Sequence, residues 1–596
     1  MASPATTQTV RPLDTLRFDT SGPPQITGVV TDHLRLLGAR ADRPAPTDGP
    51  AAGTTLAGGG FAPALATAAW ADPASGLADE ATVQAATGIM AVHGRRDGTP
   101  RGLAVDYAAT ATAVLTVQGL LANLVGQARG GAAAHVATSA DRAGLLAVSQ
   151  YLAAAGADEG EAAETGAGGP PFTSADGVLF ELETLDAGAW AAFWQALEAP
   201  REALRTGWRP FQFRYATACA PIPAALHTTA RSHGWDRILA AAAASGAEVC
   251  ALRTLADRAA EHDGAAPWFL TPTAGGVPAA AGAGRPTGPA PGRPLAGLTV
   301  LEAGRRIQAP LAAHLLGLLG ADVIRIEPPG GDPLRGMPPA CCGISARWLA
   351  LNRGKRAVEI DIKAEADRGR LRDMAAHADV FLHNWAPGKA AALGLDADDL
   401  ARVNPALVYA YTSGWAGRLD DAPMGTDFMV QARTGVGEAA RPAGEIPAPS
   451  LMTLLDVLGG LLGAEAVLAG LLLRERTGRG VRVDSSLLGA ADTLTGPALR
   501  RAARGEDPRR PAGFRHPLAT ADGWIAPADA DARAAAGHDL RGLPTGEALS
   551  RLREHGLTAA AVTTELPDLH HDPRFAGSIS RDAHGAPAVP DPWSFV

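Results

Sequence analysis

QARTGVGEAARPAGEIPAPSLMTLLDVLGGLLGAEAVLAGLLLRERTGRGVRVDSSLL, residues 431–488, is the stretch that decides the fold. It predicts a loop rich in Pro and Gly, then a long apolar helix that ends in a basic turn before Gly478, then a short strand over 481–484. One acid, Asp456, lies at the start of the apolar helix. Burying a carboxylate is costly unless groups such as helix N-terminal amides bond to it. Asp456 is therefore either a solvated helix cap or a functional group.

A second copy of this stretch occurs near the start of the chain, in residues 84–137. Three landmarks recur at offsets of 347, 350 and 346 residues: QAATG at 84–88 with QARTG at 431–435, Asp106 with Asp456, and PFTSADG at 171–177 with PLATADG at 517–523. Landmarks at nearly one offset predict an internal duplication of one large unit, not a short-period solenoid.

Composition limits the class of protein. The 596 residues are 46% hydrophobic and 19% charged, which predicts a globular chain of two to four domains. The net charge of −9, with no basic block, gives no support to a nucleic-acid partner. The cysteines lack metal-ligand spacing, so we expect reduced thiols and no metal site. They are Cys219, Cys250, Cys341 and Cys342.

No segment predicts a membrane or an exported protein. The N-terminus has no apolar core of signal-peptide length. The most apolar run, 461–473, contains Glu465 and is too short to span a bilayer. We therefore expect a cytoplasmic protein without membrane contact.

The two halves differ in their patterns along the chain. We expect a flexible lead over 1–25, a strand and helix within 26–39, a loop over 40–60, and a mixed α/β region from about 170 to 270. The Pro-, Gly- and Ala-rich segment 271–294 reads as a linker. After it, strands and helices alternate, which predicts a doubly wound parallel sheet. No GxGxxG follows the first strand at 298–302, so a dinucleotide cofactor is not supported.

Six segments of the second half resemble the family III CoA-transferases, the formyl-CoA and carnitine CoA-transferase group. They are PLAGLTVLEAGR, LLGADVIRIEPPGGDPLRG, LALNRGKRAVEIDIK, ADVFLHNWAPG, LGLDADDLARVNPALVYAYTSGW and TGRGVRVDSSLL. The resemblance implies a Rossmann-like CoA-binding domain, a smaller α/β domain and interlocked dimers. We therefore predict a fused tandem pseudo-dimer. Its parts are a degenerate copy with a shortened CoA-binding part (1–270), the linker (271–294), and a second copy with a trimmed small domain (295–596).

The resemblance also implies the site. Asp456 matches the aspartate that attacks an acyl-CoA thioester, and Gly460 fits the same pattern. Carboxylate attack gives a mixed anhydride and free CoA thiolate, and nearby backbone amides would stabilise the oxyanions. The positions that match CoA contacts are Ile307, Ile360, Lys363, Asn384, Trp385 and Gly388. CoA and acyl-CoA are then substrates, with a small carboxylic acid, and no cofactor is tightly bound.

Two departures bear on activity. Ala390-Ala391-Ala392 stands where the family often has an arginine, whose loss would weaken phosphate binding. In the first copy, most CoA-binding motifs are missing, and Thr110 replaces the glycine matched by Gly460. We therefore predict one competent site, at Asp456, with Asp106 a relic or a structural cap. The chain would be a monomeric pseudo-dimer or form a homodimer.

Two alternatives stay open. Acyl-CoA racemases on the same fold place a histidine where this chain has Thr426, so racemization is disfavoured unless a residue such as His93 from the other half substitutes. A non-catalytic homologue would suit the duplication and the missing arginine. CoA binding discriminates, because either enzyme requires it and a scaffold does not.

Overall fold

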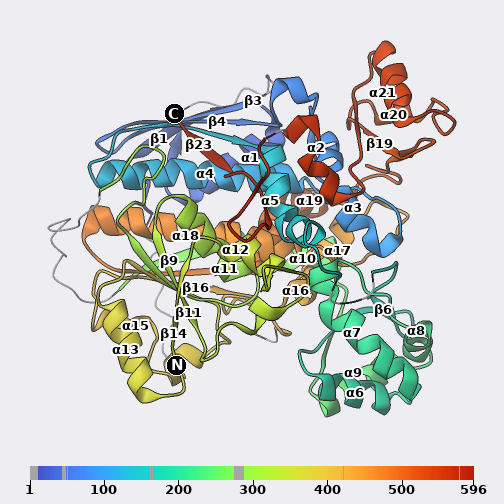
Figure 1. The fold of residues 1–596 in the computed structure, drawn as a ribbon, viewed down its shortest axis with the longest axis horizontal. Helices are drawn as coiled ribbons and strands as arrows, with labels where there is room; N and C mark the ends of the chain where they lie inside the picture. Colours follow the sequence, from blue (N-terminus) through green and yellow to red (C-terminus); the bar gives the residue numbers. More distant parts are fainter. Residues whose placement is uncertain are drawn as a thin grey trace.

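The computed structural model describes residues 11–42, 49, 51–161, 163, 165–273, 288–420, 422–575 and 577–596. Most of the predicted linker, residues 274–287, lies outside the described residues. The described chain stacks two sheets on opposite sides of a central layer of helices (Figure 1). Each sheet draws most of its strands from one half of the chain.

The second-half sheet has the predicted doubly wound form. Its strands are β10 (Thr299–Ala303), β11 (Asp322–Glu327), β14 (Arg356–Glu359), β15 (Val380–His383), β16 (Val408–Ser413) and β17 (Val481–Ser486). These six are parallel in the spatial order β14-β11-β10-β15-β16-β17, which is the dinucleotide-binding order 3-2-1-4-5-6. Helices α11 (Gln308–Leu318) and α18 (Leu454–Thr477) cover one face, and α13 (Glu365–Ala375) and α15 (Ala397–Ala401) cover the other.

The first-half sheet corrects three predictions. The strands are β1 (Leu16–Ser21), β2 (Arg40–Ala41), β3 (Ala51–Gly58), β4 (Phe61–Ala69) and β5 (His135–Ser139). Residues 1–25 are therefore not wholly a lead, 40–60 is not wholly a loop, and the strand expected at 26–30 is part of helix α1 (Pro24–Leu36). The β3–β4 hairpin buries alternate small side chains against the helix layer. Its Ala- and Gly-rich sequence hides that alternation.

The two halves exchange their last strands. β9 (Trp268–Pro272), from the first half, pairs antiparallel with β17 at the edge of the second-half sheet. β23 (Trp593–Phe595), from the end of the chain, pairs antiparallel with β5 in the first-half sheet. The halves are thus interlocked within one chain, as the resemblance predicts for the two chains of a dimer.

Two apolar helices form the centre. α4 (Tyr107–Ala128) and α18 pack against each other between the sheets (Figure 1). Both are long and apolar enough to cross a membrane by composition alone, and α18 is longer than the apolar run predicted from sequence. Their apolar windows are 100% and 94% buried, so in this fold they serve as core helices.

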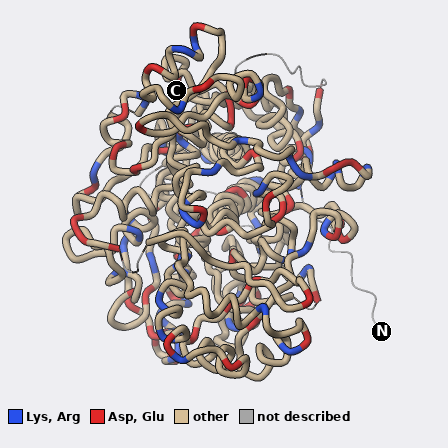
Figure 2. The backbone as a smooth tube through the Cα atoms, turned by 90° about the vertical axis from the view of Figure 1, so that its right-hand side faces the viewer, with Lys and Arg blue, Asp and Glu red and all other residues tan. Residues whose placement is uncertain are grey.

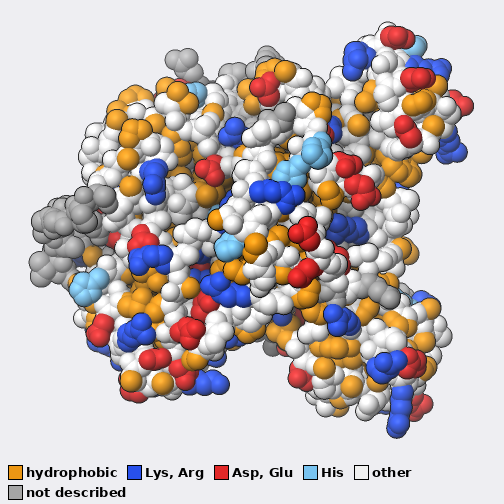
Figure 3. Space-filling model, in the orientation of Figure 1, with side chains coloured by type: hydrophobic (Ala, Val, Ile, Leu, Met, Phe, Trp, Pro, Cys, Tyr) orange, Lys and Arg blue, Asp and Glu red, His pale blue; other side chains and the backbone are white. Residues whose placement is uncertain are grey.

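Two small domains project from one side. The first holds β6 (Phe172–Thr173), β7 (Leu179–Glu183) and β8 (Glu248–Ala251) with helices α6 (Ala187–Ala196), α7 (Arg201–Thr217), α8 (Ala224–Arg231) and α9 (Trp235–Ser245). The second holds β18 (Leu518–Ala519), β19 (Trp524–Pro527) and β20 (Ala559–Ala561) with α20 (Ala532–Ala535) and α21 (Thr545–Glu554). A recess separates the two lobes on the right of Figure 3. Acidic and basic residues are interspersed along the chain (Figure 2).

Candidate active site

Asp456 is the third residue of α18, where the helix dipole favours a negative charge. Its side chain stays partly exposed although its neighbours are buried. Its backbone N–H donates to Asp427 Oδ2 at 2.6 Å, and the Leu455 N–H also donates to that carboxylate. Asp427 opens helix α16 (Asp427–Arg433). Asp427 thus caps α18, and these two amides are not free for a substrate oxyanion, contrary to the simplest reading of the sequence.

A hydrogen-bonded chain ties this cap to the first half. Gln431 Nε2 donates to Asp427 Oδ1 (2.5 Å) and to the Ser450 carbonyl (2.9 Å), and Gln431 Oε1 accepts from the Ser450 N–H (2.8 Å). His93, in α3 (Ile89–Gly94), has its Nδ1 2.8 Å from Ser450 Oγ. The first half therefore helps to fix the loop that leads into α18.

Burial controls the charges at this site. It raises the pKa of Asp456 to about 6, with the Arg306 charge opposing the shift and Glu183 adding to it. Burial, together with the Asp456 charge, raises the pKa of Asp427 to about 8. The two carboxyls titrate as a pair. Burial and the nearby Arg441 cation lower the pKa of His93 to about 3, so His93 is neutral near pH 7.

The first small domain docks directly beside Asp427. Thr426 Oγ1 donates to Glu183 Oε2 at 2.8 Å, and Glu183 is also paired with Arg214 at 3.1 Å. The Arg214 guanidinium lies over the Phe428 ring, 4.8 Å from its centroid. Because Thr426 and Phe428 flank Asp427, these contacts couple the small domain to the cap of α18.

Two strained backbone conformations occur around Asp456. Thr453, the residue before α18, has φ 54° and ψ 49°, a left-handed conformation that is rare for a β-branched residue. Arg306, whose charge acts on Asp456, has φ 61°. Non-glycine residues held in this region cost of the order of 1–3 kcal/mol and cluster at functional sites.

The pairing of Asp106 with Asp456 is wrong. In the first half, Glu80 takes the place of Asp427: it accepts from Gln84 Nε2 (2.8 Å) and from the N–H groups of Ala108 and Ala109 (both 2.8 Å). These bonds match those of Gln431, Leu455 and Asp456 at the constant offset of 347 residues. Ala109, fully buried, is therefore the counterpart of the nucleophile. In the same register Gly460 corresponds to Ala113, not to Thr110.

Asp106 has a structural role instead. It immediately precedes α4, and its carboxylate lies 2.6 Å from Arg515, whose side chain is 1% exposed. Arg515 also bonds Asp529 (2.6 Å) and the carbonyls of Leu103 and Val105. A buried guanidinium therefore holds the loop that leads into α4. No carboxylate stands at the nucleophile position of the first half.

The matched networks give a controlled test. Gln431→Ala is expected to lower kcat by roughly 10- to 100-fold, because the Asp427 cap of α18 loses a buried hydrogen bond. Gln84→Ala removes the same bond from the first half and is expected to cost about 1–2 kcal/mol of stability with kcat unchanged. Steady-state kinetics and urea unfolding of both variants check this. Equal kinetic losses in the two variants would contradict the assignment of one active half.

The predicted CoA contacts lie at the carboxyl ends of the second-half strands. Asn384 follows β15 and bonds Arg305 through both side-chain atoms, Oδ1 accepting from the N–H (2.8 Å) and Nδ2 donating to the carbonyl (2.9 Å). Trp385 is half-buried against the His383 ring, 4.8 Å away. Lys363 is exposed after β14, and Gly388 has φ 75°. Ile307 lies at the start of α11. Ile360 is 1% exposed and packs in the core. Asn384 and the Ile307 loop are brought together; Ile360 does not face a ligand.

Three contributors were not placed in the site by sequence reasoning: Glu183, Arg306 and Ser450. Glu183 and His93 lie hundreds of residues from Asp456 along the chain, so no local spacing links them. Arg306 precedes the predicted CoA contact Ile307 in the sequence, and this proximity could have placed Arg306 in the site.

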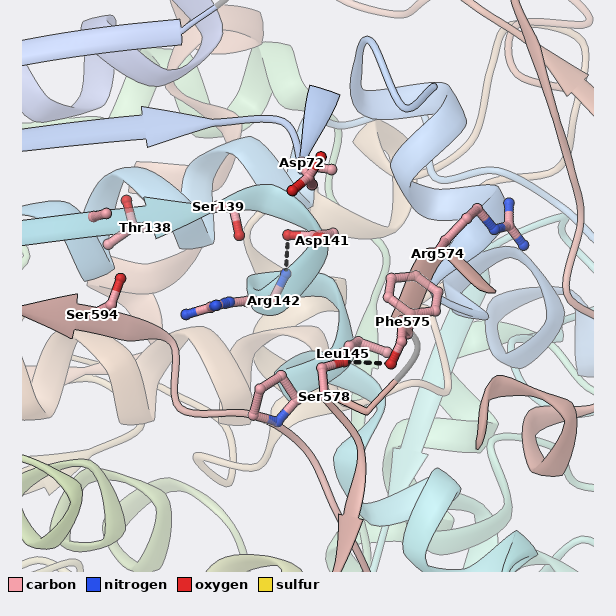
Figure 4. A pocket seen from close by; sticks show the side chains of 13 residues that line it. Asp72, Thr138, Ser139, Asp141, Arg142, Leu145, Arg574, Phe575, Ser578 and Ser594 are labelled. Carbon is pink, nitrogen blue, oxygen red and sulfur yellow. Dashed lines mark hydrogen bonds between the residues drawn. The ribbon is translucent and has the colours of Figure 1, made fainter. Parts of the chain in front are cut away.

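One cavity lies away from Asp456. A space of about 290 Å³ lies at the carboxyl ends of β4 and β5, between the start of α5 (Ala140–Ala155) and the C-terminal segment (Figure 4). Asp72, Asp141 and Arg142 line it, and Arg142 points toward Ser594. None of the residues around Asp456 contributes to its wall.

Comparisons with known proteins find similar chains. The succinyl-CoA–L-malate CoA-transferase beta subunit of Chloroflexus aurantiacus is 37% identical over 199 residues, 33% of this chain and 49% of that protein. The acetyl-CoA:oxalate CoA-transferase of Acetobacter aceti is 32% identical over 299 residues, 49% of this chain and 72% of that protein. A CAIB/BAIF family protein from Brucella suis superposes with a TM-score of 0.45 at 27% identity, covering 50% of this chain and 91% of that one.

The chain spans about half the length of the curated relatives it matches first, 49% and 46% of the two proteins. The model of CoA-transferase family III matches two successive regions, residues 69–280 and 295–584, as a tandem duplication requires. Together these regions cover most of the 596 residues. The chain belongs to CoA-transferase family III.

Proposed function

We propose that this protein transfers CoA from an acyl-CoA to a carboxylic acid through covalent intermediates on Asp456. The observation that carries the proposal is the arrangement of Asp456: a partly exposed carboxylate on the first turn of a buried helix, held by the Asp427 cap. The relatives' names pair a CoA thioester with a small acid, which supports the same substrate classes here.

The chemistry needs no proton donor. The Asp456 carboxylate attacks the thioester carbon, the C–S bond breaks, and CoA leaves as a thiolate while a mixed anhydride forms. The thiolate then attacks the aspartyl carbon and releases the first acid as its carboxylate. The second acid attacks the aspartyl thioester and frees the thiolate again. The thiolate finally attacks the new acyl carbon and regenerates Asp456.

The exchange of β9 and β23 supports one pseudo-dimer per chain. Ala109 at the position that corresponds to Asp456, and the pairing of Asp106 with the buried Arg515, support one active site per chain.

Racemization is the weaker candidate. Thr426 occupies the position of the racemase histidine and donates to Glu183. His93 comes from the other half, but its Nδ1 lies against Ser450, and burial with the Arg441 charge keeps it neutral. No observation favours a proton-transfer role for it.

The acid limb of the pH–rate profile is a prediction of this proposal. Asp456 must be ionised to attack, so kcat/KM for the acyl-CoA is expected to fall as pH drops below about 6. The Glu183 charge raises the pKa of Asp456, so Glu183→Gln is expected to move this limb to lower pH. Glu181→Gln, two residues away on the same strand, is the control and should leave the limb in place. A shift of the acid limb to higher pH in Glu183→Gln would contradict the conclusion that the Glu183 charge raises the pKa of Asp456.

The test of the function itself is covalent trapping. The protein is incubated with a panel of short acyl-CoAs, quenched with hydroxylamine, and examined by intact and peptide mass spectrometry. We expect one hydroxamate per chain, on the peptide that contains Asp456. No adduct with any donor and no CoA binding by calorimetry would move the assignment to a non-catalytic homologue. CoA binding with α-proton exchange and no adduct would identify a racemase.

A further inference from the structure

The loop between β10 and α11 holds an arginine, Arg306, whose charge acts on Asp456. Arg306 is exposed and has a left-handed backbone, φ 61°. In the part of the chain that the structure describes, its guanidinium forms no hydrogen bond or ion pair. The other arginines around the site differ: Arg214 is paired with Glu183, and Arg441 with Asp97 and Glu445. A cation kept unpaired at the cost of backbone strain points to an anionic ligand.

An aromatic ring from the first half supports this guanidinium. Arg306 Cζ lies 5.4 Å from the centroid of Tyr215, in α7. The Tyr215 hydroxyl donates to Met337 Sδ (3.4 Å), which fixes the end of the ring, and the Tyr215 backbone carbonyl accepts from the Tyr151 hydroxyl (3.1 Å), which fixes the backbone of α7 at this point. An arginine that lies over a ring keeps its N–H edge free for bidentate binding of a carboxylate.

The arginine acts on the nucleophile and occurs only at that site. Arg306 supplies the cationic charge that opposes the raised pKa of Asp456. In the first half, Gly22 and Pro23 lead directly into α1, whereas in the second half Arg305, Arg306 and Ile307 separate Gly304 from α11. The half without a nucleophile therefore also lacks the arginine.

We propose that Arg306, supported by Tyr215, binds the carboxylate of the acid that leaves Asp456 and of the acid that replaces it. The inference rests on the proposed function and names the ligand of one part of the site: a carboxylate anion. When CoA thiolate attacks the aspartyl carbon, the anhydride C–O bond breaks and a free carboxylate appears beside the thiolate. The entering acid occupies the same place before its oxygen attacks the aspartyl thioester. A fixed guanidinium offsets the repulsion between these anions at both stages.

Arg306→Gly is the decisive variant, because glycine adopts φ 61° without strain and the fold should be retained. We expect kcat/KM for the acceptor acid to fall roughly 10- to 100-fold, the scale of a lost charge-assisted pair. Added guanidinium chloride should restore part of the rate, and the Kd of free CoA should stay unchanged. Arg306→Lys should lose less of the kcat/KM for the acceptor acid, because it keeps the positive charge. Arg479→Met, at an exposed arginine just beyond the C-terminal end of α18, is the control and should behave as wild type, with thermal midpoints recorded for all variants.

Other outcomes overturn the inference. Arg306→Gly could bind CoA more weakly and lose kcat/KM for the acceptor acid by the same factor as it loses affinity for CoA. Arg306 would then be a contact for the CoA phosphates. Identical kinetics of Arg306→Gly and Arg479→Met would leave Arg306 without a role in acid binding. Failure of the proposed function is distinguishable, because wild-type protein would then form no hydroxylamine-trapped adduct at all.

Discussion

Asp456→Asn is expected to lower CoA transfer by about four orders of magnitude or more, since an amide cannot form the anhydride and the thioester then has no nucleophile. Asp106→Asn is expected to keep near wild-type kcat and to lose only stability. Its carboxylate binds the buried Arg515, which retains Asp529 and two backbone carbonyls as partners. A loss of about 1–3 kcal/mol is the usual scale for a hydrogen bond to a charged group.

Steady-state turnover and hydroxylamine trapping on both variants measure this difference. The two aspartates have similar sequence surroundings, so each variant is a fair control for the other. In the structural register Asp456 matches Ala109, so we expect only Asp456→Asn to lose turnover. If Asp106→Asn abolished turnover and Asp456→Asn did not, the register and the single-site proposal would both be wrong.

The second-half fold was predictable because each of its elements has a clear local sequence pattern. Each parallel strand is a short apolar run bounded by turn residues, and the strands alternate with helices in an order that a doubly wound sheet requires. The first-half sheet was not predicted because β3 and β4 are built from Ala, Gly and Thr, whose burial alternation has little contrast. A signal for the strand exchange was present: Pro267-Trp268 and Pro592-Trp593 both introduce exchanged strands.

At the site, the sequence predicts Asp456 as the reactive residue but pairs it with the wrong residue of the first half. Similar residue types suggested Asp106, whereas the register is set by which amides bond to Glu80 and Asp427. Both acids stand four residues before their motif glutamine, so the correct offset could be read from them. The contributions of His93 and Glu183 could not be read, because they depend on how the first half and its small domain dock on the second. Such contacts are long-range and leave no local spacing.

His33→Ala is expected to lower the free energy of unfolding by about 3 kcal/mol at pH 8, because it leaves a buried carboxylate without its partner. His33, in α1 of the first half, has its Nδ1 3.0 Å from Glu465 Oε1 and 3.1 Å from Oε2. The side chains are 3% and 0% exposed. Glu465 lies in α18, so this pair joins the first half to the helix that carries the nucleophile.

The loss is expected to depend on pH in a defined direction. Burial raises the pKa of Glu465, and His33 opposes that shift, so removing His33 raises the pKa further. A carboxyl with a raised folded-state pKa destabilises the fold above that pKa and ceases to do so once it is protonated. His33→Ala should therefore lose less stability at pH 5 than at pH 8.

Urea unfolding of wild type, His33→Ala and His33→Ala/Glu465→Gln at both pH values measures this. The double variant carries no buried charge at this place, so the stability gap between it and His33→Ala should be larger at pH 8, where Glu465 is ionised, than at pH 5. The His33 ring also packs edge-on against Trp268, with centroids 5.0 Å apart, and that contact is lost in both variants. If His33→Ala lost equal stability at the two pH values, the cost would come from this packing contact in the exchanged strand β9 and not from the charge of Glu465.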